Sequence, residues 1–121
     1  MGKTRKYNPV KLIFGFIYSD EAVFVKAKTK LKRKFGKQDF ESAAIDFNYT
    51  DYYEKEMGTG LKRRFISFKK LIPPSGLSKI KIYTNRIEEK LSSASCRLIN
   101  IDPGYLDLSK LILASTKDYK H

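Results

Sequence analysis

The hydrophobic pattern first predicts a strand over residues 10–18. Its apolar side chains fall on both faces, with Ile13 and Ile17 on the face opposite to Leu12, Phe14, Phe16 and Tyr18. Alternation with a period of two is typical of a strand, and apolar residues on both faces indicate a central strand that is covered on both sides. Gly15, at its middle, leaves room for the close approach of another element.

A helix is predicted directly after this strand. The run Ser19-Asp20-Glu21 supplies a capping side chain and an acid for the first turn, and Gly36 is a typical stop. Between them, apolar residues recur at three- and four-residue steps: Phe24, Ala27, Leu31 and Phe35. The other helix face is basic and includes Lys26, Lys30, Arg33 and Lys34. Basic residues late in a helix also suit its dipole, so much of this charge needs no ligand.

The later elements follow from similar patterns. Residues 77–92 fit one helical face, although 79–83 also alternate like a strand; the helix is favoured. Residues 102–104, Asp-Pro-Gly, are predicted to form a turn, and residues 108–116 fit a last helix or a strand about equally. The remaining predicted strands are 40–49, 61–68 and 96–101.

In chain order these elements read strand, helix, strand, strand, helix, strand. This order predicts an α+β fold, the ferredoxin-like βαββαβ two-layer sandwich, with an extra C-terminal helix or strand as a further option. Right-handed crossovers would place both helices on one face of the sheet. Residues 1–9 are predicted to be a flexible basic arm and residues 10–121 a single domain.

The cysteine and histidine content excludes several kinds of site. Cys96 is the only cysteine and His121 the only histidine, which excludes an internal disulfide and a zinc site built from His and Cys within one chain. Cys96 is expected to be a small core residue. No apolar run approaches the roughly 18 residues of a membrane span, so a cytoplasmic protein without a membrane segment is expected.

The net charge of +12 implies attraction to polyanions. Lysines on solvated helix faces explain the same charge without a ligand, and this explanation is slightly favoured over specific nucleic-acid binding.

The least generic stretch is 46–58, which gathers acids and phenols between basic flanks. Paired carboxylates can bind Mg²⁺ or act as acid and base, and the candidates are Asp46, Asp51 and Glu54, with Asp102 if the strand ends meet. Asp46 and Asp51 are weak candidates for metal ligands. The favoured alternative is a surface loop whose acids neutralise the basic flanks, with no resident cofactor.

Tyrosines and basic residues near this stretch suit a planar anionic ligand. Stacked phenols and cations can bind a base and its phosphate. Packing of the tyrosines in the core is the commoner case, and the sequence does not separate phosphate binding from charge on an edge strand. The residues are Tyr49, Tyr52 and Tyr53 with Lys62, Arg63 and Arg64.

Several separated motifs resemble those of one bacterial family. The motifs are KLIFGFIYSDE, FNYTDYYEKEMG, LKRRFISFKKLI, IKIYTNRIEEKL and NIDPGYLDLSKLILASTKDYKH. From about Pro9 to His121 the chain resembles domain-of-unknown-function family 4416, which implies an uncharacterised cytoplasmic protein and supplies no catalytic residue. Such proteins are sometimes labelled GTP-binding, but this sequence has no Gly-rich phosphate loop. Family members look longer, so a truncated form that dimerises through an uncovered C-terminal edge is expected.

Three functions stay open on the sequence. The first is a small module that binds an anionic ligand, RNA or a nucleotide, through basic–aromatic strands. The second is a Mg²⁺-dependent enzyme acting on a phosphorylated small molecule. The third is a structural protein–protein interaction module.

Overall fold

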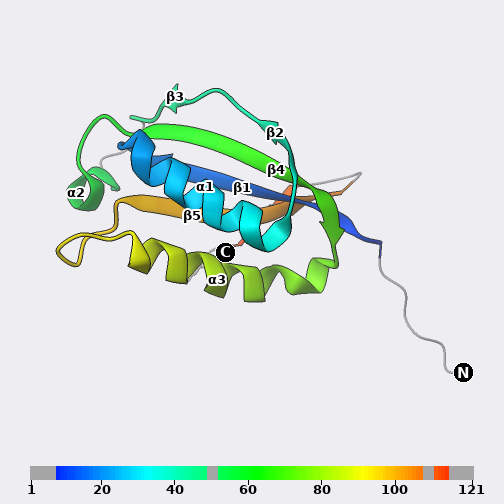
Figure 1. Ribbon diagram of the computed structural model, residues 1–121. Coiled ribbons are helices and arrows are strands. Elements are labelled where there is room, and N and C mark those ends of the chain that lie inside the picture. Colours follow the sequence, from blue (N-terminus) through cyan, green and yellow to red (C-terminus); the bar gives the residue numbers. More distant parts are fainter. Residues whose placement is uncertain (1–7, 49–51, 108–110, 115–121) are drawn as a thin grey trace, which may run out of the picture.

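The computed structural model describes residues 8–48, 52–107 and 111–114 (Figure 1). Within these residues one antiparallel sheet runs in the order β2-β4-β1-β5-β6, and β3 also pairs with β4. The strands are β1 (Val10–Tyr18), β2 (Gln38–Glu41), β3 (Ile45–Asp46), β4 (Lys62–Ile72), β5 (Ile99–Leu106) and β6 (Leu111–Leu113). The helices are α1 (Glu21–Phe35), α2 (Glu54–Met57) and α3 (Leu77–Lys90), the last preceded by the 3-10 turn η1 (Pro74–Gly76). The predicted α+β class is confirmed.

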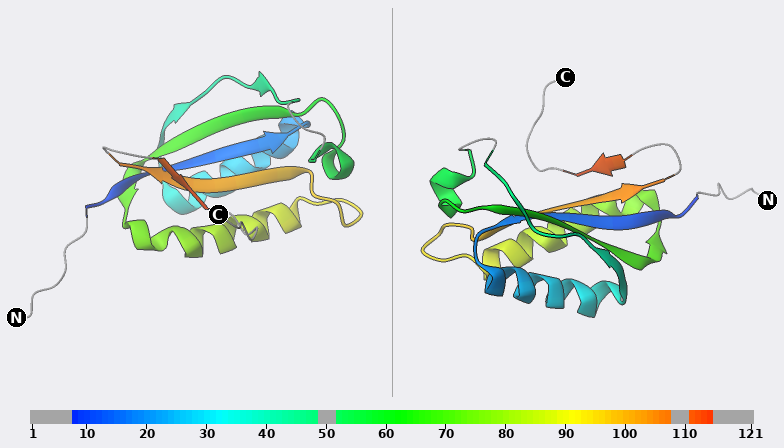
Figure 2. Two further views of the ribbon diagram at one scale, coloured as in Figure 1. Left: turned by 180° about the vertical axis from the view of Figure 1, so that it is seen from behind. Right: turned by 90° about the horizontal axis from the view of Figure 1, so that it is seen from above.

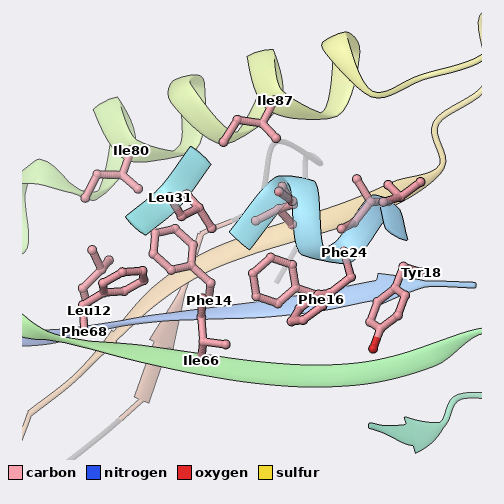
Figure 3. Packing of buried hydrophobic residues seen from close by; sticks show 14 of the residues in the cluster. Leu12, Phe14, Phe16, Tyr18, Phe24, Leu31, Ile66, Phe68, Ile80 and Ile87 are labelled. Atoms are coloured by element: carbon pink, nitrogen blue, oxygen red, sulfur yellow. The ribbon is translucent and has the colours of Figure 1, made fainter. Parts of the chain in front are cut away.

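Helices α1 and α3 cover one face of the sheet (Figure 2), as the crossover rule predicts. The core lies between these helices and β1, whose even-numbered residues form its centre (Figure 3). Phe14 contacts the rings of Phe16, Phe35 and Phe68 at centroid distances of 6.5, 5.6 and 5.6 Å. The fully buried residues of the core include Leu12, Phe14, Phe16, Tyr18, Phe24, Leu31, Ile66, Phe68, Ile99 and Ile101.

Both predicted long helices are present. Helix α1 begins after Asp20, whose carboxylate accepts a hydrogen bond from the backbone N–H of Ala22 at 2.9 Å. It ends at Gly36, which has a φ of 94°, a conformation that glycine adopts without steric cost. Helix α3 spans Leu77–Lys90, so the strand-like alternation of 79–83 does not form a strand.

The second predicted strand, 40–49, is wrong as a continuous element. Strand β2 ends at Glu41 and β3 holds Ile45–Asp46 alone, while Tyr49 lies outside the described residues. Between β2 and β3, the Ser42 hydroxyl accepts a hydrogen bond from the backbone N–H of Phe65 at 2.9 Å. A side chain thus takes the place of a backbone partner, which interrupts the ladder.

The predicted turn at residues 102–104 is also wrong, because β5 continues through it to Leu106. The carbonyl of Pro103 accepts a hydrogen bond from Ala114, which follows β6. The nitrogen of Pro103 points to the same side as its carbonyl, away from β1, so the missing N–H leaves the β1–β5 ladder intact. Asp102 consequently lies inside a strand and not at its end.

The other boundaries differ less. Strand β4 extends beyond the predicted 61–68 to Ile72, and the C-terminal element is the strand β6, although 108–110 and 115–116 lie outside the described residues.

Cys96 is exposed in a turn where it exchanges backbone hydrogen bonds with Ser93, so its predicted core position is wrong. In the described parts of the chain, no helix is long and apolar enough to cross a membrane.

Candidate functional site

The candidate site lies on the sheet face opposite α1 and α3, which we call the second face. Its centre is Gly15 of β1, which pairs with Phe65 of β4 on one side and with Asp102 of β5 on the other. A Cβ at Gly15 would lie 2.9 Å from Phe65 Cε1 and 3.0 Å from an Arg63 guanidinium nitrogen. The glycine therefore makes room for these two side chains, as its position in the sequence predicted.

Arg63 lies between two aromatic rings on the second face. Its guanidinium carbon is 4.9 Å from the ring centroid of Phe65 and 5.8 Å from that of Phe47, within the range of cation–π attraction. Arg63 forms no ion pair with any described residue. Its positive charge is thus positioned by aromatic rings and not neutralised by an acid.

Two exposed apolar side chains extend this surface toward the edge of the sheet. Phe40 is 57% exposed and Ile45 is 54% exposed. Phe40 pairs with Ser67 and Ile45 pairs with Arg63, so both share the face of their partners. We call the set Phe40, Ile45, Phe47, Arg63 and Phe65 the aromatic–arginine patch.

Arg64, the next residue, points to the helix side and is committed to internal contacts. It donates hydrogen bonds to the Tyr18 hydroxyl at 3.2 Å and to Glu21 at 2.9 Å, and it pairs with Glu41 at 2.6 Å. Its guanidinium carbon also lies 4.6 Å from the Phe24 ring centroid. Both terminal guanidinium nitrogens of Arg64 are thus engaged within the protein, while its Nε is buried without a hydrogen-bond partner among the described residues. Arg64 joins α1 to the sheet, and its ligand-binding role stays a prediction.

The environment of this internal cluster shifts two pKa values. Burial raises the pKa of Tyr18 against the opposing hydrogen bond from Arg64. Burial also raises the pKa of Glu41, but hydrogen bonds from Lys28 and Gln38 outweigh it, and the net pKa lies below its usual range. The Glu41 carboxylate is therefore held ionised by its cationic neighbours.

Lys62 forms an exposed ion pair with Asp46 at 2.9 Å. The hydrogen bond to Asp46 raises the pKa of Lys62. Exposed pairs of this kind contribute little to stability, so Lys62 can exchange Asp46 for another anion. The pair also shows what Asp46 does in the described structure: it compensates a lysine of the neighbouring strand.

The described parts of the predicted stretch, residues 46–48 and 52–58, lie over one end of the second face. Met57 of α2 packs with Ile17 and Leu61, and Phe47 and Tyr53 pack against this small cluster. Tyr52 is exposed, and its ring lies at 89° to that of Tyr53 with 4.9 Å between centroids. Tyr49 and Asp51 lie outside the described residues. Tyr53 thus serves partly as core, whereas Tyr52 is accessible.

A polar network that the sequence did not reveal ties α2 to β5. Arg97 donates to both oxygens of Glu56, with Nη2–Oε1 and Nε–Oε2 distances of 3.0 and 3.2 Å, and to Asn100 at 2.8 Å. Asn100 in turn donates to Asp102 at 2.9 Å. The hydrogen bonds from Arg97 lower the pKa of Glu56. Asp102 is therefore occupied within the network.

The network continues to the outer edge of β5, where α3 supplies two charged side chains. Glu88 accepts a hydrogen bond from the backbone N–H of Ile101 at 2.7 Å, and Lys81 donates to the carbonyl of Ile101 at 2.9 Å. Both side chains are buried. Burial raises the pKa of Glu88, opposed by the Ile101 hydrogen bond and by Lys81 and Arg97.

Replacing Glu88 by glutamine is expected to make stability less dependent on pH. Because the folded-state pKa of Glu88 lies above its usual 4.5, the folded chain retains a proton that the unfolded chain has lost. As the pH rises from the unfolded-state pKa of Glu88 through its folded-state pKa, this difference in bound protons lowers the free energy of unfolding of the wild type. Urea denaturation from about pH 4 to pH 8 should show the variant gaining stability relative to wild type.

The matched variant for this experiment is Glu89→Gln, which changes an exposed carboxylate on the same helix. A difference between Glu88→Gln and wild type that stays constant with pH would contradict the expected effect.

Two of the described candidate acids, Asp46 and Asp102, lie on strands that are not neighbours in the sheet. Asp46 is on β3 and Asp102 is on β5, with β4 and β1 between them, a separation of about 14 Å at the usual strand spacing. Glu54 lies in the first turn of α2. Among the described residues, no group of three or more His, Cys, Asp or Glu could hold a metal ion.

The comparisons with known proteins give a family and no activity. The family model described as Domain of unknown function (DUF4416) matches residues 8–121. The chain belongs to this family. No curated protein and no solved structure matches the chain. The DUF4416 membership confirms the resemblance seen in the sequence.

Proposed function

We propose that this chain binds single-stranded RNA, or a nucleotide as its unit, through the aromatic–arginine patch. The observation that carries the proposal is the guanidinium of Arg63, which stacks on Phe65 at 4.9 Å and has no acid partner among the described residues. This retains the anionic ligand expected from the sequence and takes Arg63, one of the predicted ligand-binding residues, as the centre of the site.

The chemistry of the patch suits a base with its phosphate. Every base has a π-face that can stack on an aromatic side chain, with roughly 1–3 kcal/mol gained per base. Phe40 is exposed and Phe65 is half-buried, so their rings offer such surfaces. Arg63 lies beside them and carries the charge that a phosphate requires. Lys62, on the same strand, adds a second cation once it leaves Asp46.

We also propose that the fold is a variant of the ferredoxin-like arrangement. Support comes from the strand order: with β2 and β3 counted as one interrupted strand, the path β2-β4-β1-β5 places the first strand between the third and the fourth. The strand β6 and the short α2 are additions to that plan. We further propose a cytoplasmic location, in keeping with the single, exposed Cys96.

The decisive experiment compares two neighbouring arginines on opposite faces of β4. Fluorescence anisotropy with a single-stranded RNA should show that Arg63→Gln lowers affinity about tenfold, the loss of one stacked, phosphate-binding cation. Arg64→Gln, with the same change in net charge, should leave affinity within about twofold and lower the free energy of unfolding by about 1–2 kcal/mol.

Equal losses of affinity in both variants would mean that overall charge, and not the patch, binds RNA. Phe65→Ala provides a second test, because it removes a stacking ring without changing charge. Retention of full RNA affinity by Phe65→Ala would overturn the stacking model and favour a protein partner, since exposed aromatic and arginine side chains also suit protein interfaces.

A further inference from the structure

Helices α1 and α3 lie on the sheet face opposite the aromatic–arginine patch (Figure 2). Residues of both helices line a basic groove. It consists of two adjoining hollows of about 410 and 320 Å³ that share Lys30, Arg33 and Lys90. The cations that line it are Lys26, Lys30 and Arg33 from α1 with Arg86 and Lys90 from α3. We call these five residues the helix groove, and no acidic residue lines either hollow.

The five cations of the helix groove form no ion pair with a described residue. Several cations elsewhere are compensated: Lys28 pairs with Glu41, Lys81 lies near Asp102, and Arg97 binds Glu56. The acid at the start of α1, Glu21, is directed to Arg64. The positive charge of the groove is thus concentrated and uncompensated, which raises the local potential toward anions.

The cations of the helix groove are regularly spaced along each helix, and Tyr83 of α3 contacts α1 within the groove. Along α1 and α3, residues four apart, such as Lys26 and Lys30 or Arg86 and Lys90, lie about 6 Å apart along the helix axis. Tyr83 lies in the groove; its hydroxyl reaches the carbonyl of Lys30 at 3.4 Å, and its ring packs on Phe35 at 6.0 Å. The helix groove is therefore lined by one row of cations from α1 and one from α3, with Tyr83 among them.

We propose that the helix groove is a second binding site, which takes the sugar–phosphate backbone of double-stranded RNA. A continuous polyanion can neutralise both rows at once and gains affinity from released counterions. A-form duplexes are recognised mostly by shape and by their phosphates and 2′-hydroxyls, so cations without exposed aromatic rings are sufficient. This site does not rest on the function proposed for the aromatic–arginine patch.

The surroundings of the helix groove favour a nucleic acid over a membrane. Helices that bind a bilayer surface project aromatic and large aliphatic side chains beside their basic residues. On the described α1 and α3, the exposed large apolar side chains are Val25 and Ile82, neither of which is aromatic. Val25 lines the groove wall and Tyr83 its floor, so apolar surface is recessed between the cations.

The experiment uses a short duplex RNA of mixed sequence and the full chain. In a duplex the bases are already stacked on one another, so the rings of the aromatic–arginine patch have no stacking partner. The triple variant Arg33→Gln/Arg86→Gln/Lys90→Gln should lose affinity by about tenfold or more, and its plot of log K against log salt should be shallower by about 2–3, because up to three phosphate contacts are lost.

The matched control is Lys32→Gln/Lys69→Gln/Lys79→Gln, which removes three exposed lysines outside the helix groove and changes the net charge equally. This control should keep nearly full affinity and salt slope. Equal losses in the two triple variants would overturn the site, since net charge alone would then explain binding. Competition by poly-glutamate as strong as that by duplex RNA, or equal binding to phosphatidylserine vesicles, would also overturn it by assigning the groove to another anion.

Discussion

Replacing Phe14 by alanine is expected to lower the free energy of unfolding by about 3–5 kcal/mol, the usual cost of removing a fully buried phenyl ring. Phe14 is 0% exposed and contacts three other phenyl rings, so the cavity it leaves cannot collapse without moving both α1 and β4. Thermal denaturation should show a midpoint roughly 10–20 °C lower.

The matched variant is Phe40→Ala, which removes the same ring from an exposed position on β2. Its stability should change by less than about 0.5 kcal/mol, as surface substitutions usually do. Equal destabilisation by the two variants would show that the core is not centred on the helix face of β1.

Replacing Arg97 by alanine is expected to destabilise the chain by about 2 kcal/mol. Arg97 is the only described cation that binds Glu56, and it also lies 3.6 Å from the buried Glu88. Its loss leaves the Asn100 Oδ1 without this hydrogen-bond donor and removes a positive charge beside Glu56 and Glu88. Unpaired charges in a buried position destabilise the folded state. Urea denaturation at neutral pH measures the effect.

Arg97→Lys is the informative companion, because lysine keeps the charge and loses the planar fork that reaches both Glu56 and Asn100. Its stability should fall between wild type and Arg97→Ala. A value equal to that of wild type would mean that charge alone, without hydrogen-bond geometry, holds α2 to β5.

The parts of the fold predicted from the sequence are those with strong local signals. Strand β1 was predicted with its observed bounds, because alternation over nine residues leaves no competing helical pattern. Helix α1 carries both a cap and a stop, Asp20 and Gly36. Helix α3 was favoured by its spacing of apolar residues, and burial of Ile80, Thr84 and Ile87 confirms that face.

The errors arose where a side chain or a distant strand decided the structure. Ser42 interrupts the second strand by binding the Phe65 backbone, an interaction across 23 residues that no local pattern reports. Asp-Pro-Gly at 102–104 is a strong turn signal, yet pairing with β1 on one side keeps it extended. Tertiary pairing overrides local preference in both cases.

The site was harder to predict than the fold. Alternation places Arg63 and Arg64 on opposite faces of a strand, but the sequence alone does not say which face carries the helices. The burial of Lys81 and Glu88 depends on where α3 meets β5, which no local pattern reports. The helix groove likewise combines residues about 55 positions apart, which only helix packing brings together.

The way α3 holds Ile101 has a consequence for aggregation. The edge of an antiparallel sheet can recruit a strand from another molecule through its unpaired backbone groups. On β5, Lys81 and Glu88 bind the carbonyl and N–H of Ile101, and β6 pairs with the strand from Gly104 to Leu106. A foreign strand would first have to displace two buried charges. Helix α3 thus serves as a barrier to intermolecular sheet growth, and partial unfolding of this helix would be the step that exposes the edge to other copies of the chain.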